Sequence, residues 1–274
     1  MNHYIGLISV ICFNFLLMGC SGMRTLGSGS SVSRKLVYID DAKNGFILEA
    51  NRSLVKLNAN GDEMFRYDFE IPVFKTGMYN GLQFYAFNES FQRFFILDKY
   101  LNQITSIDFS MHFPNIVEHP VLDGNQSIWL FNRNENKVQR WTTQFSILTE
   151  TQNLDLIIPG VSIDQIFIRK NIVYLVDFDK GLYEFDFTGQ LVAQHLLPGI
   201  AEEVQIDGDR LYFYQTGKWY FINLSDSLMS PKVVLSFEDQ SNKDIVNGIF
   251  FNNSFYYWNE NTSEVKMIDF AVGK

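Results

Sequence analysis

The chain has 274 residues, and its 22 Lys and Arg against 31 Asp and Glu give a formal net charge of −9. With 46% hydrophobic and 19% charged residues, its composition is that of a globular protein and not of a disordered one. The acidic balance argues against a nucleic-acid partner, because phosphate contacts need clustered Lys and Arg, and an aromatic content of 16% favours half-buried strands.

The first segment of the chain has the pattern of a signal peptide. Residues 1–19 contain no Lys, Arg, Asp or Glu, and residues 5–18 are almost wholly apolar. This apolar run is shorter than the about 20 residues that a helix needs to span a bilayer. It has the length of the hydrophobic region of a signal peptide. We therefore expect residues 1–19 to be a signal peptide.

A lipid attachment site follows directly. Residues 17–20, Leu-Met-Gly-Cys, resemble the bacterial lipobox, in which the cysteine becomes the first residue of the mature protein. The resemblance implies a diacylglyceryl group on the sulfur of Cys20, cleavage before Cys20 and acylation of the new amine. An ordinary secretory signal with a chance cysteine is the alternative. After Cys20 the chain is rich in Gly and Ser up to residue 34, so we expect residues 20–34 to form a flexible tether.

The lipobox resemblance also implies a location. In bacterial lipoproteins, Ser rather than Asp after the lipidated cysteine is associated with sorting to the outer membrane, and Ser21 stands at this position. No acidic cluster follows Cys20. We therefore expect a protein anchored by its lipid to the outer membrane, on the periplasmic face.

Cysteine chemistry is excluded from the mature chain. The lipobox resemblance implies that Cys12 leaves with the signal peptide and that Cys20 is acylated, so no free thiol is expected to remain. Disulfides, zinc–thiolate sites and cysteine nucleophiles are therefore not expected.

The remainder of the chain repeats one unit of about forty residues. Each copy has a short apolar strand that ends at a polar residue, then a turn and a second strand. The clearest copies are residues 93–109, 127–142, 172–187 and 254–270, and weaker ones are 44–58 and 210–224. The closing polar residues are Glu49, Asp98, Asn132, Asp177, Gln215 and Asn259, with a mean spacing of (259 − 49)/5 = 42 residues.

This repeat predicts an all-β propeller over residues 35–274. The fourth unit contains four strand-like segments, at residues 163–169, 171–177, 181–187 and 190–197. A four-stranded meander that recurs at this period is typical of a propeller blade. Six four-stranded blades are expected, and the uneven spacing leaves seven open. Residues 35–41 are either the inner strand of blade one or the outer strand of blade six.

Two segments carry a family resemblance. Residues 119–130 contain Pro120, Asp123, Gly124 and Asn125 before an apolar strand, and residues 204–214 form a second copy. They look like NHL-type or quinoprotein-like repeats. As a whole, residues 35–272 resemble the propeller lipoproteins of bacterial envelopes, of the Bacteroidota type. The resemblance implies contact with an envelope protein or complex and gives no specific chemistry.

No catalytic motif is present. The chain lacks a paired-histidine metal motif, a Gly-x-Ser-x-Gly elbow, a P-loop and a dinucleotide fingerprint. The polar residues that close the strands are expected to bind backbone N–H groups of the following turns.

The starts of the inner strands are the best place for a ligand site, because in propellers they face the mouth of the central channel. Counting back about thirteen residues from the closing polar residues leads to a candidate set of His119, Asp164, Glu203 and Asn247. Six-bladed lactonases hold calcium at such a mouth, so resemblance to them implies a calcium cofactor and sugar-acid hydrolysis. The same residues also fit solvated loops.

Two functions therefore remain. The favoured one is a non-enzymatic, membrane-tethered module that binds or scaffolds an envelope protein. The alternative is a calcium-dependent, lactonase-like hydrolase. The aromatic segment 77–95 is expected to form two buried strands of blade two, and the loop at Phe91 would be a partner-binding surface if it is exposed.

Overall fold

The structure is a computed structural model that describes residues 33–112, 115–123, 127–197, 201, 203–224, 231–236, 248–259, 262 and 264–269. All of them belong to one compact unit, Val32–Lys274. The predicted signal peptide, Cys20 and the tether up to residue 32 lie outside the described residues, and so does Asn247.

The regular secondary structure of the described chain is almost entirely β-strand, and the strands form six antiparallel sheets. Blade one contains β1 (Arg34–Ile39), β2 (Gly45–Glu49), β3 (Ser53–Leu57) and β4 (Glu63–Asp68), and blade two contains β5 (Lys75–Tyr79), β6 (Gln83–Asn88), β7 (Arg93–Asp98) and β8 (Gln103–Asp108). Blade three contains β9 (Val117–Leu122), β10 (Ser127–Asn132), β11 (Lys137–Thr142) and β12 (Ile147–Glu150), and blade four contains β13 (Gln165–Arg169), β14 (Ile172–Asp177), β15 (Gly181–Asp186) and β16 (Leu191–Leu196). Blade five contains β17 (Glu203–Asp207), β18 (Arg210–Gln215), β19 (Lys218–Asn223) and β20 (Lys232–Ser236), and blade six contains β21 (Ile249–Phe251), β22 (Ser254–Asn259) and β23 (Glu264–Asp269).

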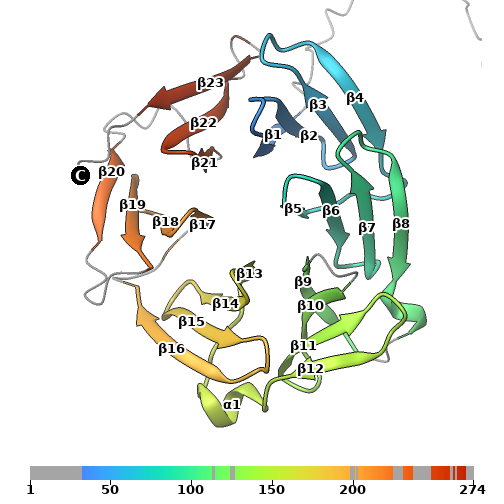
Figure 1. The fold of residues 1–274 in the computed structure, drawn as a ribbon, viewed down its shortest axis with the longest axis vertical. Helices are drawn as coiled ribbons and strands as arrows, with labels where there is room; N and C mark the ends of the chain where they lie inside the picture. Colours follow the sequence, from blue (N-terminus) through green and yellow to red (C-terminus); the bar gives the residue numbers. More distant parts are fainter. Residues whose placement is uncertain are drawn as a thin grey trace, which may run out of the picture. The chain divides into compact units, whose positions relative to one another are not determined.

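The six sheets follow one another around a ring, with the first strand of each blade innermost (Figure 1). The predicted six-bladed β-propeller is therefore confirmed. Five blades have four strands, and the described part of blade six has three. Of the predicted segment 35–41, residues 35–39 belong to β1, the inner strand of blade one, which decides between the two predicted roles.

The structure corrects the predicted closing residue of blade two. Asp98 ends β7, the third strand of its blade, whereas the other five closing residues each end a second strand. The equivalent residue in blade two is Asn88, at the end of β6. Replacing 98 by 88 changes the spacings to 39, 44, 45, 38 and 44 residues, which removes most of the unevenness. The error arose because β6 and β7 are both apolar and both end at a polar residue.

Burial explains why the middle strands are apolar on both faces. Every residue of β10, with the sequence SIWLFN, is buried, because blade three is packed between two neighbouring blades. The outer strands have water on one side, and β4 and β16 alternate between more and less exposed residues. This pattern is the expected one for a sheet that is buried at its centre and wet at its rim.

The core is divided into six hydrophobic clusters, one for each pair of adjacent blades. The cluster between blades six and one joins Leu36, Ile47 and Val55 to Tyr256 and Trp258. Among the described strands, none of blade one is hydrogen-bonded to a strand of blade six. In the described chain, this seam of the ring is therefore held by side-chain packing.

Two short helical segments lie between blades. The 3-10 helix η1 (Phe109–Met111) follows β8, and α1 (Leu154–Ile157) precedes β13. The side chains of Asp108 and Asn153 cap them by accepting a backbone N–H. In the part of the chain that the structure describes, no helix has the length and apolar character needed to cross a membrane.

Candidate functional site

The ring has two ends, and we call one of them the connection face. Because the strands of each blade are antiparallel, the first and third strands begin on this face. It therefore also carries the turns between second and third strands and, where the structure describes them, the links from one blade to the next.

The predicted channel-mouth residues occupy comparable places in three adjacent blades. His119 is the third residue of β9, Asp164 directly precedes β13, and Glu203 is the first residue of β17. His119 and Asp164 both lie in the field of Lys75, the first residue of β5. Within the described residues, no hydrogen bond or ion pair joins Glu203 to His119 or Asp164, and no group of three or more His, Cys, Asp or Glu could hold a metal ion.

His119 connects three blades. Its Nδ1 lies 3.3 Å from Nζ of Lys75 in blade two, and its ring also bonds the backbone of Ile163, just before blade four. Burial and the charge of Lys75 lower the pKa of His119 to about 4, so the ring is neutral at pH 7. Its backbone φ of 49°, unusual for a residue within a strand, places it at an irregularity of β9 directly before Pro120.

Two carboxylates and two cations surround His119. Nζ of Lys75 lies 2.9 Å from Oε2 of Glu89, and Nη2 of Arg133 lies 2.7 Å from Oε1 of the buried Glu118. Burial, with the like charge of Glu89 nearby, raises the pKa of Glu118. Burial acts to raise the pKa of Glu89, but the hydrogen bond and the charge of Lys75 outweigh it, so the pKa of this carboxyl is lowered. The cluster is thus a charge-balanced network that links blades two and three.

Lys75 was missed in the sequence, although the counting rule that led to His119 also leads to it. Thirteen residues before Asn88 is position 75, which is the first residue of β5. The rule failed because Asp98 had been taken as the closing residue of this blade. With Asn88 in its place, blades two to five follow one pattern.

Most of the closing polar residues bind turns, as predicted from the sequence. The side chains of four residues in the predicted set accept hydrogen bonds from backbone N–H groups two to four residues later: Asp98, Asn132, Asp177 and Asn259. Glu49 differs, because its carboxylate pairs with Arg34 and Arg66.

Exposed apolar side chains occur on the loops at the connection face of blades two and three. Four large side chains there are exposed: Phe74 by 62%, Phe91 by 59%, Met111 by 79% and Ile116 by 45%. We call these four residues the blade-two patch. They come from the links before β5 and β9, the β6–β7 turn and η1. Phe91 meets the condition set from the sequence, that its loop be exposed.

Two polar residues hold the loops of the blade-two patch together. The side chain of the buried Asn88 donates to the carbonyl of Pro72 at 2.5 Å and accepts from the N–H of Phe91 at 2.6 Å. The side chain of Gln92 bonds both the N–H and the carbonyl of Val117, next to Ile116. The carbonyl of Gln92 also accepts the N–H of Phe109, which begins η1. The patch is therefore presented on loops fixed to one another.

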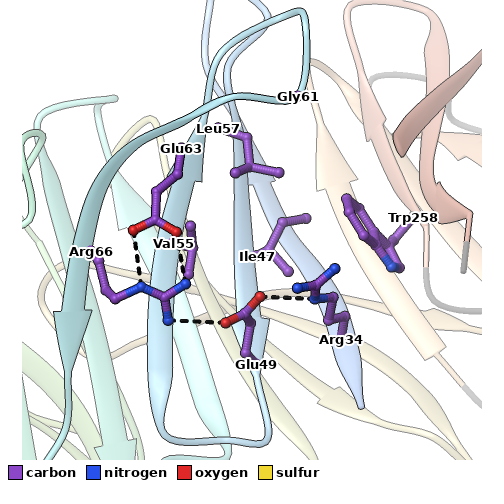
Figure 2. Close-up of a pocket in the computed structure, with 9 residues that line it drawn as sticks. All are labelled: Arg34, Ile47, Glu49, Val55, Leu57, Gly61, Glu63, Arg66 and Trp258. Carbon is purple, nitrogen blue, oxygen red and sulfur yellow. Dashed lines mark hydrogen bonds and ion pairs between the residues drawn. The ribbon is translucent and has the colours of Figure 1, made fainter. Parts of the chain in front are cut away.

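A cleft of about 280 Å³ opens at the seam between blades one and six (Figure 2). Ile47, Val55 and Leu57 form its apolar wall, and Trp258 of blade six faces them. Its charged lining consists of Arg34, Glu49, Glu63 and Arg66.

No protein-family model matches the sequence, and no curated protein matches it either. Among solved structures, the chain is similar to a streptogramin B lyase at 12% identity, with a TM-score of 0.58 over 90% of this chain and 86% of that chain. It is also similar to virginiamycin B lyase from Staphylococcus aureus at 12% identity, with a TM-score of 0.55 over 89% and 87%. A protein of unknown function from Bacteroides caccae shares 13% identity, with a TM-score of 0.50 over 87% and 90%. At these identities the likeness shows the propeller fold alone.

Proposed function

We propose that this chain is a lipid-tethered propeller that binds an envelope protein through the blade-two patch. The observation that carries the proposal is the exposure of Phe91 on a turn that buried Asn88 holds in place. Water-exposed clusters of large apolar side chains on globular proteins mark interaction sites.

The structure of the patch suits protein binding for two physical reasons. Aromatic side chains often supply much of the binding energy at protein interfaces. The patch offers two exposed aromatic side chains, Phe74 and Phe91. The hydrogen bonds of Asn88 and Gln92 already fix the loops, so little conformational entropy remains to be lost on binding.

The anchor and the location belong to the same proposal. The lipobox-like Leu17–Cys20 segment supports acylation at Cys20, and Ser21 supports the outer membrane, on its periplasmic face. A net charge of −9 would keep the propeller away from anionic headgroups. The lipid would concentrate the protein at the membrane and leave the patch for a protein partner.

The test is a cross-linked pull-down of the tagged full-length chain from native envelopes. The patch variant is Phe91→Ser, and the matched control is Leu82→Ser, which removes a side chain that is also 59% exposed but lies in the β5–β6 turn on the opposite face. We expect a stoichiometric partner with wild type and Leu82→Ser, and its loss with Phe91→Ser. Equal recovery with both variants would refute the patch, and Cys20→Ala tests whether capture needs the lipid.

A further inference from the structure

We propose that the seam cleft binds a small carboxylic acid with an apolar body, whose carboxylate pairs with Arg34 and whose body lies against Trp258. The site is separate from the blade-two patch, because it is formed by blades one and six. It does not depend on the proposed protein-binding function.

Arg34 supplies the donors. Its Nε forms an ion pair with Oε1 of Glu49 at 2.8 Å, and within the described residues no hydrogen bond or ion pair is made by its two terminal nitrogens. The side chain is 37% exposed, and Figure 2 shows it between Glu49 and Trp258. A guanidinium with both terminal nitrogens unused can bind a carboxylate through two parallel hydrogen bonds.

The acidic residues of the cleft are already neutralised. Oε2 of Glu49 lies 3.0 Å from Nη1 of Arg66, and Glu63 binds the same guanidinium at 3.0 and 2.7 Å. Two glutamates and two arginines therefore cancel in charge, so an entering carboxylate meets no net negative charge. The hydrogen bonds that Arg66 donates to Glu63 lower the pKa of the Glu63 carboxyl, which keeps this balance at neutral pH.

The rest of the cleft fits an apolar body. The Trp258 ring lies 5.2 Å from Cζ of Arg34, and the aliphatic side chains of Ile47, Val55 and Leu57 face the same space (Figure 2). A cavity of about 150 Å³ is enough to bind benzene. At about 280 Å³, the cleft has room for one ring with a short acidic arm.

Calorimetric titration of the purified full-length chain with phenylacetate tests the proposal, with phenylacetamide as its uncharged counterpart. We expect saturable binding of the acid with a Kd of about 1 mM or tighter and at least about tenfold weaker binding of the amide. Arg34→Lys keeps the charge beside Glu49 but loses the planar fork, so it should weaken the acid about tenfold and leave the amide unchanged. Trp258→Leu should weaken both ligands.

The control is Arg52→Lys, which changes an exposed arginine outside the cleft. It should bind phenylacetate as the wild type does, and the thermal midpoint of each variant checks that it is folded. Absence of saturable binding by the wild type, equal affinity for acid and amide, or wild-type affinity of a folded Arg34→Lys would each overturn the proposal. None of these results bears on Phe91, so failure here is distinguishable from failure of the protein-binding function.

Discussion

At the scale of single residues, His119 combines a neutral, half-buried ring with a left-handed backbone conformation. Both features belong to its place between three blades. Lys75 donates a hydrogen bond to Nδ1 of the ring, and the ring is also hydrogen-bonded to the backbone of Ile163. Such strain is found where surrounding structure holds a residue firmly. The ring is thus a bridge within the propeller, with both of its bonding positions used.

The lowered pKa of His119 predicts a pH dependence of stability. The folded protein takes up this proton only near pH 4, while the unfolded chain takes it up near 6.5. Between these values the unfolded state binds more protons, so stability falls as the pH drops, by up to about 1.4 kcal/mol per pH unit. Asn tolerates the left-handed backbone and cannot titrate, so His119→Asn should flatten this part of the profile.

The measurement is urea denaturation of both proteins at several pH values between 4 and 7. The wild-type minus variant difference isolates His119, because the charged groups around it remain in both proteins: Lys75, Glu89, Glu118, Arg133 and Asp164. A difference that does not change with pH would show that the ring is protonated at the same pH in the folded and unfolded states.

At the scale of elements, the β6–β7 turn is the part of the fold on which the proposed function depends. Asn88 ends β6 and is buried. Its side chain donates to the carbonyl of Pro72 in one loop and accepts from the N–H of Phe91 in another. Its side chain therefore acts both on the stability of blade two and on the position of Phe91.

Asn88→Ala should destabilise the protein by about 1–3 kcal/mol, because it leaves the Pro72 carbonyl and the Phe91 N–H without their partners. The control is Asn60→Ala, in the exposed β3–β4 turn, where about 0.5 kcal/mol or less is expected. Denaturant unfolding gives both values. Equal effects of the two substitutions would mean that Asn88 does not hold the loops.

Blade two also shows how far the sequence predicts this fold. The repeat, the preference for six blades and the turn-binding role of Asp98 and Asn132 were predicted, because strand period and turn chemistry are local properties. Seven blades stayed open, because taking Asp98 as a closing residue made the spacing uneven. The blade boundary was not, because β6 and β7 share one pattern and only pairing distinguishes a second strand from a third. Lys75 was missed as a direct consequence.

Neither the blade-two patch nor the cleft was predicted as a whole, since both join residues that are distant in the sequence. Phe91 was named from its aromatic surroundings, but the other exposed residues of the patch, such as Ile116 and Met111, come from other loops. Arg34 and Trp258 come from the first and last blades, and meet only where the ring is completed. Sequence spacing contains no information about such contacts.

At the scale of the whole molecule, the propeller presents two different surfaces. Six interblade clusters fix the blades and leave their loops for other contacts. The connection face carries the patch and the charged network around His119, while the seam carries the cleft. The patch accounts for the proposed partner binding, and the cleft can hold a small ligand independently of it.

The most direct measurement of the central claim places a photo-cross-linking amino acid at position 91 or position 82 of the full-length chain in native envelopes. Both side chains are 59% exposed, but they lie on opposite faces of the ring. We predict one discrete cross-linked protein from position 91 and none from position 82. The same products from both positions, or no product from position 91, would contradict binding through the blade-two patch.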